Sequence, residues 1–163
     1  MPDVDSQSYF PVISPTAHSS PYWSLPTDRR TQLKQTAKGT FTVEMKPQGD
    51  ADVMNGVTTG RMSLNKKFDG DLTANGSGVM LTAMTPVKGS AGYVAIERVI
   101  GTLNGKEGSF VFQHSGIMDR GTQQLSVTVV PGSGTGELTG IDGKFTIIIA
   151  EGKHSYEFEY FLP

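Results

Sequence analysis

Short runs in which apolar and polar residues alternate follow one another along most of the chain from Gly39 onward. A period of two is typical of β-strands, because successive side chains point to opposite faces. Tight-hairpin dipeptides stand at Asp69-Gly70, Asn104-Gly105 and Asp142-Gly143, with Glu151-Gly152 a weaker example. No span of useful length has a helical period. The pattern predicts an all-β domain with little or no helix.

The runs number about eight or nine, and many of them are joined by direct hairpins. Such a chain forms an antiparallel meander, which either closes into an up-and-down β-barrel or packs as a sandwich. Direct hairpins favour the barrel, because Greek-key sandwiches need long crossovers. Closure would also remove exposed strand edges.

Composition divides the chain into two segments. All 20 glycines lie at or after Gly39, whereas five of the nine prolines lie before it. Residues 1–38 form a Pro/Ser/Thr-rich N-terminal tail that contains a few aromatic residues. A segment of this kind cannot bury enough apolar surface to fold alone, so it is expected to be either flexible or docked on the domain or a neighbouring subunit. Residues 39–163 are predicted to form the single barrel domain.

The segment Gly92–Gly116 predicts a long hairpin that turns at Asn104-Gly105. A two-residue turn would pair Glu97 with Phe112, and a four-residue turn would pair Glu97 with His114. Both registers place Glu97 and His114 on one face of the hairpin, either diagonal or directly opposite. Tyr93, Phe110 and Phe112 share that face.

Glu97 and His114 are the candidate catalytic residues. In a partly desolvated cavity, a carboxylate and an imidazole can orient one another and act as general base or acid. A structural ion pair is the alternative. On the other face of the hairpin, Arg98 and Gln113 could bind a carboxylate or a phosphate, or could form an intersubunit contact.

The C-terminal hairpin has the clearest polarity. With a turn at Glu151-Gly152, the inward face carries Phe145, Ile147 and Ile149 together with His154 and Tyr156. His154 lies at one end of this face, where it is either a structural histidine or part of a binding site. The candidate ligand-binding residues are Tyr93, Phe110, Phe112, His154, Tyr156, Arg98 and Gln113.

Apolar side chains on both faces of the 92–116 hairpin predict a further contact outside the barrel, and hence a homodimer or homotrimer. The formal net charge of -2 gives no argument for nucleic acid or a membrane surface as partner. There is no cysteine, and the three histidines have no metal-ligand spacing, so neither a cofactor nor a metal is expected. The chain has no apolar run of membrane-spanning length and no signal-peptide pattern at its start, which favours the cytoplasm.

Four phrases carry a resemblance to a known family: GRMSLNKKFDGDL, TPVKGSAGYVAIERVIGTLNGKEGSFVFQHSG, VTVVPGSGTGELTG and GKHSYEFEYFLP. They resemble the bacterial domain of unknown function 3224 family, whose fold is similar to the allene oxide cyclase barrel. The resemblance covers residues 39–163 and implies an eight-stranded antiparallel barrel with a small, largely apolar interior. It implies no established reaction, and no catalytic residue is carried over from it.

Three functions are compatible with these patterns. The first is a barrel that binds a small hydrophobic or amphipathic ligand, with Glu97 and His114 as polar anchors. The second is an isomerase, cyclase or lyase that uses the same pair for proton transfer. The third is a structural homo-oligomer whose barrel is filled by its own side chains.

Overall fold

A computed structural model of the chain describes residues 33–163. The predicted tail, up to residue 32, lies outside the described residues. The described part is all β and contains no helix. It therefore has no helix that is long and apolar enough to cross a membrane. The strands are β1 (Gln35–Pro47), β2 (Asp52–Met54), β3 (Val57–Gly70), β4 (Leu72–Met84), β5 (Ala91–Leu103), β6 (Lys106–Asp119), β7 (Thr122–Val129), β8 (Thr135–Gly136), β9 (Asp142–Ala150) and β10 (Lys153–Phe161).

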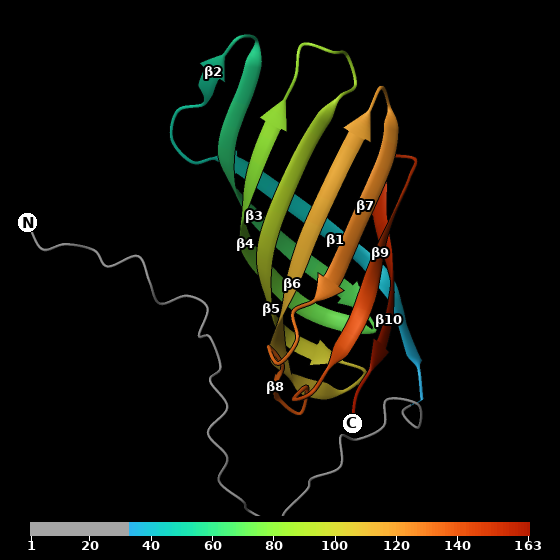
Figure 1. Cartoon of the computed structure of the whole chain (residues 1–163). Helices are drawn as coiled ribbons and strands as arrows, with labels where there is room; N and C mark the ends of the chain where they lie inside the picture. The colour runs from blue at the N-terminus through green and yellow to red at the C-terminus, as the bar shows by residue number, and fades with distance from the viewer. Residues whose placement is uncertain (1–32) are drawn as a thin grey trace, which may run out of the picture. The chain divides into compact units, whose positions relative to one another are not determined.

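Eight of these strands close an antiparallel barrel, as predicted, and β2 and β8 are short additions to it (Figure 1). The first part of β1 pairs with β10 and its second part with β3, which joins the two ends of the sheet. The seam between β7 and β9 is the shortest ladder, with the single pair Thr128 and Lys144. β1 begins at Gln35, four residues before the predicted domain boundary at Gly39, and these residues pair with β10.

Two-residue turns fix the register of the hairpins. Asn104 and Gly105 both have positive φ, as a type I′ turn requires, and Leu103 pairs with Lys106. Glu97 therefore pairs with Phe112, which is the two-residue alternative predicted from the sequence. The C-terminal hairpin also has its predicted register, with Ala150 opposite Lys153.

Two predicted two-residue turns are wrong. Asp69 and Gly70 pair with Thr40 and Gly39 of β1, and the β3–β4 ladder ends at Phe68 and Ala74, so five residues separate the paired ends. Asp142 and Gly143 begin strand β9, where they pair with Phe161 and Tyr160 of β10. The dipeptide is common in tight turns, but here the ladder with β10 continues through it. Two turns of the same type were not predicted, at Asn55-Gly56 and Arg120-Gly121, and their residues all have positive φ.

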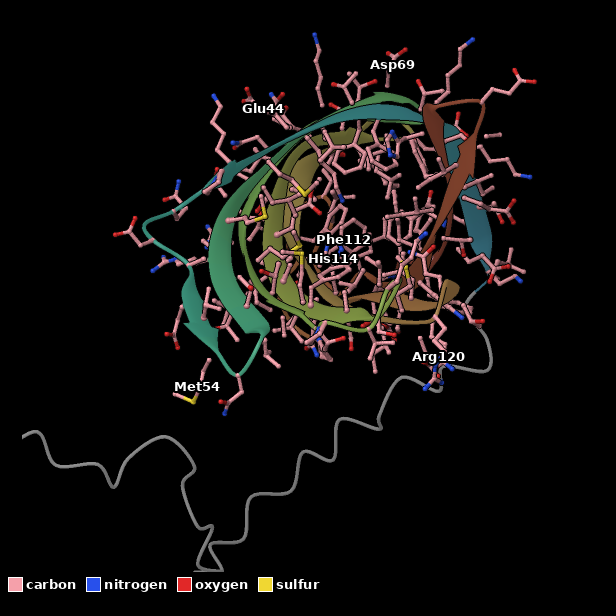
Figure 2. All side chains as sticks on the ribbon, turned by 90° about the horizontal axis from the view of Figure 1, so that it is seen from above. Glu44, Met54, Asp69, Phe112, His114 and Arg120 are labelled. Carbon is pink, nitrogen blue, oxygen red and sulfur yellow. The ribbon has the colours of Figure 1, made fainter. Side chains whose placement is uncertain are left out.

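The barrel interior has a packed half and a hollow half. Seen along the barrel, Phe112 and His114 point inward, whereas Glu44, Met54 and Arg120 lie on the outside (Figure 2). The packed half is at the end that carries β8. Its aromatic rings interlock, as in the pair Phe112 and Phe145, whose centroids are 5.0 Å apart. The buried aromatic residues are Phe41, Phe68, Phe110, Phe112, Phe145, Tyr156, Phe158 and Tyr160.

The outer face of β4 and β5 carries exposed apolar side chains. Leu81 lies opposite Val94, and Val79 lies opposite Ile96. Together they form an apolar strip on the outside of the barrel, and its β5 residues belong to the 92–116 hairpin, for which the sequence predicted a further contact. The homo-oligomer itself stays a prediction, which sedimentation of the purified protein would test.

Candidate functional site

Three charged or titratable side chains meet where the packed half ends and the hollow half begins. Glu97 lies on β5, His114 on β6 and Lys66 on β3, and all three point inward because they share the alternation of the core residues beside them. Their side chains are 0%, 3% and 4% exposed, respectively. This is the only group of buried polar or charged residues within 33–163.

Glu97 joins the other two side chains. Its Oε2 atom is 2.8 Å from Lys66 Nζ and 2.9 Å from His114 Nε2, so one carboxylate oxygen accepts two hydrogen bonds. His114 is diagonal to Glu97 across the β5–β6 ladder, since its direct partner is Ala95. We call Lys66, Glu97 and His114 the buried triad.

Strand β4 lies between Lys66 and Glu97, and a glycine lets the two side chains meet across it. Gly76 pairs with Lys66 on one side and with Val99 on the other. A Cβ atom at this position would lie 2.1 Å from Glu97 Oε1 and 3.1 Å from the ring of Phe68. The glycine therefore leaves the space that the carboxylate occupies.

Opposing effects act on the pKa of Glu97. Burial raises the pKa, because the charged form loses its hydration. The hydrogen bond with His114 and the positive charge of Lys66 favour the charged form and outweigh burial, so the pKa lies below the ordinary value for glutamate. Glu97 is therefore a carboxylate at neutral pH.

The hydrogen bonds of the triad leave some polar atoms without partners. Glu97 Oε1 is buried and has no hydrogen-bond partner among the described residues. Lys66 carries three N–H donors and uses one of them on Glu97. Its Nζ atom also lies 5.1 Å from the ring centroid of Phe41 and 5.6 Å from that of Phe68, within the range of cation–π attraction.

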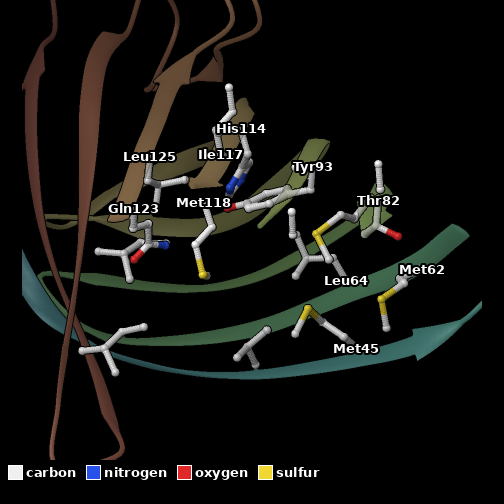
Figure 3. A pocket seen from close by; sticks show the side chains of 18 of the residues that line it. Met45, Met62, Leu64, Thr82, Tyr93, His114, Ile117, Met118, Gln123 and Leu125 are labelled. Atoms are coloured by element: carbon white, nitrogen blue, oxygen red, sulfur yellow. The ribbon is translucent and has the colours of Figure 1, made fainter. Parts of the chain in front are cut away.

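A cavity of about 540 Å³ occupies the hollow half and extends from the triad toward the β4–β5 and β6–β7 connections (Figure 3). Lys66 and His114 line it, but Glu97 does not. Phe68 and Phe112, the next inward residues on β3 and β6, are buried and do not line it. Lys66 and His114 thus form part of the cavity floor, with Glu97 behind them.

The cavity walls are mostly apolar and rich in methionine. Five of the seven methionines of the chain line it: Met45, Met62, Met80, Met84 and Met118. The other polar side chains of the lining are those of Thr82, Tyr93, Gln123 and His154. No aspartate or glutamate among the described residues lines the cavity.

Tyr93 lies on β5 near the triad. Burial raises the pKa of its hydroxyl, and the negative charge of Glu97 raises it further. Its ring covers Gly116 of β6, where an added Cβ atom would come within 2.3 Å of the ring. The tyrosine therefore stays protonated at neutral pH and offers an O–H donor at the cavity wall.

The structure separates the predicted site residues into three groups. Tyr93, His114 and His154 line the cavity. Phe110, Phe112 and Tyr156 lie in the packed half and do not line it. The Tyr156 hydroxyl accepts a hydrogen bond of 2.9 Å from the backbone N–H of Leu72, which is a structural contact.

Arg98 and Gln113 are the third group, and they lie on the outer face of the barrel. They are exposed and point away from the cavity, because they follow inward residues by one position on their strands. The two residues are not directly opposite one another, since Arg98 pairs with Val111 and Gln113 pairs with Ile96.

Lys66 was not predicted, although the sequence contains a signal for it. Met62, Leu64, Lys66 and Phe68 alternate with polar residues along β3, so the lysine occupies an inward position. A lysine in register with core residues indicates a buried partner of opposite charge, because an unpaired buried charge is costly. The partner comes from β5, two strands away in the sheet.

The fold and the site define a small antiparallel β-barrel with a half-hollow interior and a charged floor. The sequence profile of a family described as Protein of unknown function (DUF3224) matches residues 37–160, and the chain belongs to this family. The predicted resemblance is therefore confirmed. A solved structure of a DUF3224 protein of unknown function from Shewanella oneidensis MR-1 is 51% identical, with a TM-score of 0.77. The match covers 80% of this chain and 99% of that one. No curated protein matches the chain.

Proposed function

We propose that the protein binds a small hydrophobic or amphipathic molecule inside the barrel. The observation that carries this proposal is the cavity of about 540 Å³, whose walls are apolar and whose floor contains Lys66 and His114. Ligand sites in proteins typically have volumes of about 300–1,000 Å³, apolar walls and a few convergent polar groups. The cavity has each of these properties.

The packing of the barrel supports the same proposal. Eight-stranded barrels are small enough to be filled by their own side chains, and the β8 end of this barrel is filled in that way. At the other end, inward positions carry flexible methionines that leave space between them. Methionine adapts its shape to irregular surfaces, so such walls suit a guest molecule.

A cavity-filling substitution tests binding. Leu125 on β7 lines the cavity, whereas its neighbour Gln124 is exposed on the outer face. We expect Leu125→Trp to weaken binding of the neutral fluorescent probe 2-naphthalenemethanol by about tenfold or more, because the indole would occupy the space of the probe. Gln124→Trp is the matched control and should bind as the wild type does.

Thermal unfolding of both variants establishes that they are folded. The proposal is wrong if the folded Leu125→Trp variant binds the probe as tightly as Gln124→Trp. It is also wrong if the wild-type protein does not bind the probe at all.

Catalysis by an isomerase, cyclase or lyase is the second candidate, and one observation favours it. His114 lines the cavity while Glu97 accepts a hydrogen bond from its Nε2 atom, so the imidazole is oriented as a proton-transfer group would be. In this hypothesis Glu97 is a positioning residue, since it does not line the cavity. A cell extract incubated with the protein would then contain a new compound, and incubation with Glu97→Gln would yield much less of it.

A further inference from the structure

The charge of the cavity lining points to the head group of the ligand. Three of the lining side chains are basic, namely Lys66, His114 and His154, and within the described residues none is acidic. Glu97 supplies the nearest negative charge, but it lies behind the floor and accepts hydrogen bonds from Lys66 and His114. A ligand therefore meets positive charge and N–H donors first.

The floor also has hydrogen-bonding capacity that the protein does not use. Lys66 donates one of its three N–H groups to Glu97, and the other two are not used in this hydrogen bond. His114 Nδ1 has no hydrogen-bond partner in the part of the chain that the structure describes. A carboxylate has two acceptor oxygens, so it could accept from Lys66 with one and from a protonated His114 with the other.

We propose that the cavity binds an organic acid, with an apolar body among the methionines and a carboxylate head group against Lys66 and His114. This inference rests on the proposed function and extends it to the chemical class of the ligand.

Groups on several strands surround His114. Glu97 and Tyr93 flank its partner Ala95 on the same face of β5, and Lys66 lies beyond Glu97 on β3. Its neighbour on β7 is the apolar residue Val127. His154 lines the same cavity from β10. Glu97 is the only anionic group in this set, and it accepts hydrogen bonds from both Lys66 and His114.

Three probes with one aromatic body and different head groups test the proposal on the wild-type protein. They are 2-naphthoate, which is an anion, 2-naphthalenemethanol, which is neutral, and 2-naphthylmethylammonium, which is a cation. By calorimetry at neutral pH, we expect 2-naphthoate to bind about tenfold or more tightly than the alcohol, and the cation to bind most weakly.

A pair of adjacent lysines provides the matched variants. Lys66→Met keeps an unbranched apolar stem and removes the charge at the floor, whereas Lys67→Met removes a charge from the exposed face of the same strand. We expect Lys66→Met to lower the affinity for 2-naphthoate about tenfold or more and to change the affinity for the alcohol little. Lys67→Met should leave both affinities unchanged.

The outcomes separate this inference from the proposed function. Equal affinities for the three head groups would overturn the organic-acid proposal even if Leu125→Trp blocks the cavity. If Leu125→Trp blocks none of the probes, the proposed function fails as well. The comparison of probes on the wild type does not depend on the folding of any variant.

Discussion

Glu97 holds two basic side chains at the boundary between the packed and hollow halves of the barrel. A buried charge is costly unless it is paired, and each partner of this carboxylate is itself nearly inaccessible to water. Removal of the carboxylate would leave the Lys66 ammonium against the rings of Phe41 and Phe68 without a counter-charge. The triad therefore depends on Glu97 more than on either basic residue.

Glu97→Gln should lower the free energy of unfolding at neutral pH by about 3–5 kcal/mol, which is typical when one partner of a buried ion pair is removed. Urea denaturation measures this difference. Glu44→Gln is the control, because Glu44 is exposed and its ion pair with Lys46 lies on the surface. The role given to Glu97 is contradicted if the two variants are equally stable.

Low pH should lower the free energy of unfolding of the wild-type protein, because Glu97 becomes protonated. The pKa of Glu97 is lower in the folded protein than in the unfolded chain. Its contribution to stability is therefore present above the ordinary pKa of glutamate, about 4.3, and is lost as the pH falls through the lower, folded value. Urea denaturation across this acidic range measures how the free energy of unfolding changes with pH, and we expect a smaller change for Glu97→Gln than for the wild type. An equal change in the two proteins would mean that the pKa of Glu97 is not lowered by folding.

At the scale of single strands, β4 is adapted to the triad through Gly76. Alanine is ordinarily better than glycine inside a strand, but here a methyl group would displace the Glu97 carboxylate from both of its partners. We expect Gly76→Ala to lower the free energy of unfolding by about 1–3 kcal/mol, as overpacking usually does.

The control for Gly76→Ala is Gly92→Ala on β5. There the nearest atom to an added Cβ is at 3.8 Å, which is an ordinary contact. This variant should be as stable as the wild type or slightly more so. If Gly76→Ala is also neutral in urea denaturation, the glycine is not needed for the carboxylate.

The β6–β7 turn contains a residue that does not suit its conformation. Arg120 has a φ of 47°, in the left-handed region that asparagine tolerates better than arginine. Its ion pair with Asp119 is highly exposed and contributes little. We expect Arg120→Asn to raise the free energy of unfolding by about 0.5–1 kcal/mol, measured by thermal denaturation. Arg61→Asn, at an exposed strand position, should bring no gain, and a destabilised Arg120→Asn protein would contradict the explanation.

Local patterns predicted the register of the C-terminal hairpin, because a two-residue turn leaves no freedom in pairing. For the 92–116 hairpin they left two registers open, and the turn at Asn104-Gly105 selects the one that pairs Glu97 with Phe112. The same reasoning failed at Asp142-Gly143, since a turn dipeptide can also stand inside a ladder when a neighbouring strand continues past it. The composition boundary at Gly39 carries no information on strand pairing, and β1 begins at Gln35 because Gln35–Lys38 pair with the distant strand β10.

At the scale of the whole molecule, the division into a packed and a hollow half could not be predicted from any one strand. It depends on the sizes of inward side chains on all eight barrel strands at the same level of the barrel. Phe110, Phe112 and Tyr156 share the inward face with His114 and His154, yet only the two histidines reach the cavity. Lys66 was missed because its partner lies across an intervening strand and far away in the sequence.

The distribution of methionines allows a direct test of ligand binding in the hollow half. Met62 and Met80 are among the five that line the cavity, whereas Met54 is exposed on β2 outside it. Protein labelled with ¹³C at the methionine methyl groups can be titrated with 2-naphthoate and followed by NMR. We expect the cavity methionines to shift and the Met54 signal to stay in place, and we expect Leu125→Trp to suppress the shifts. Unchanged cavity signals, or an equal shift of Met54, would contradict a binding site in the barrel.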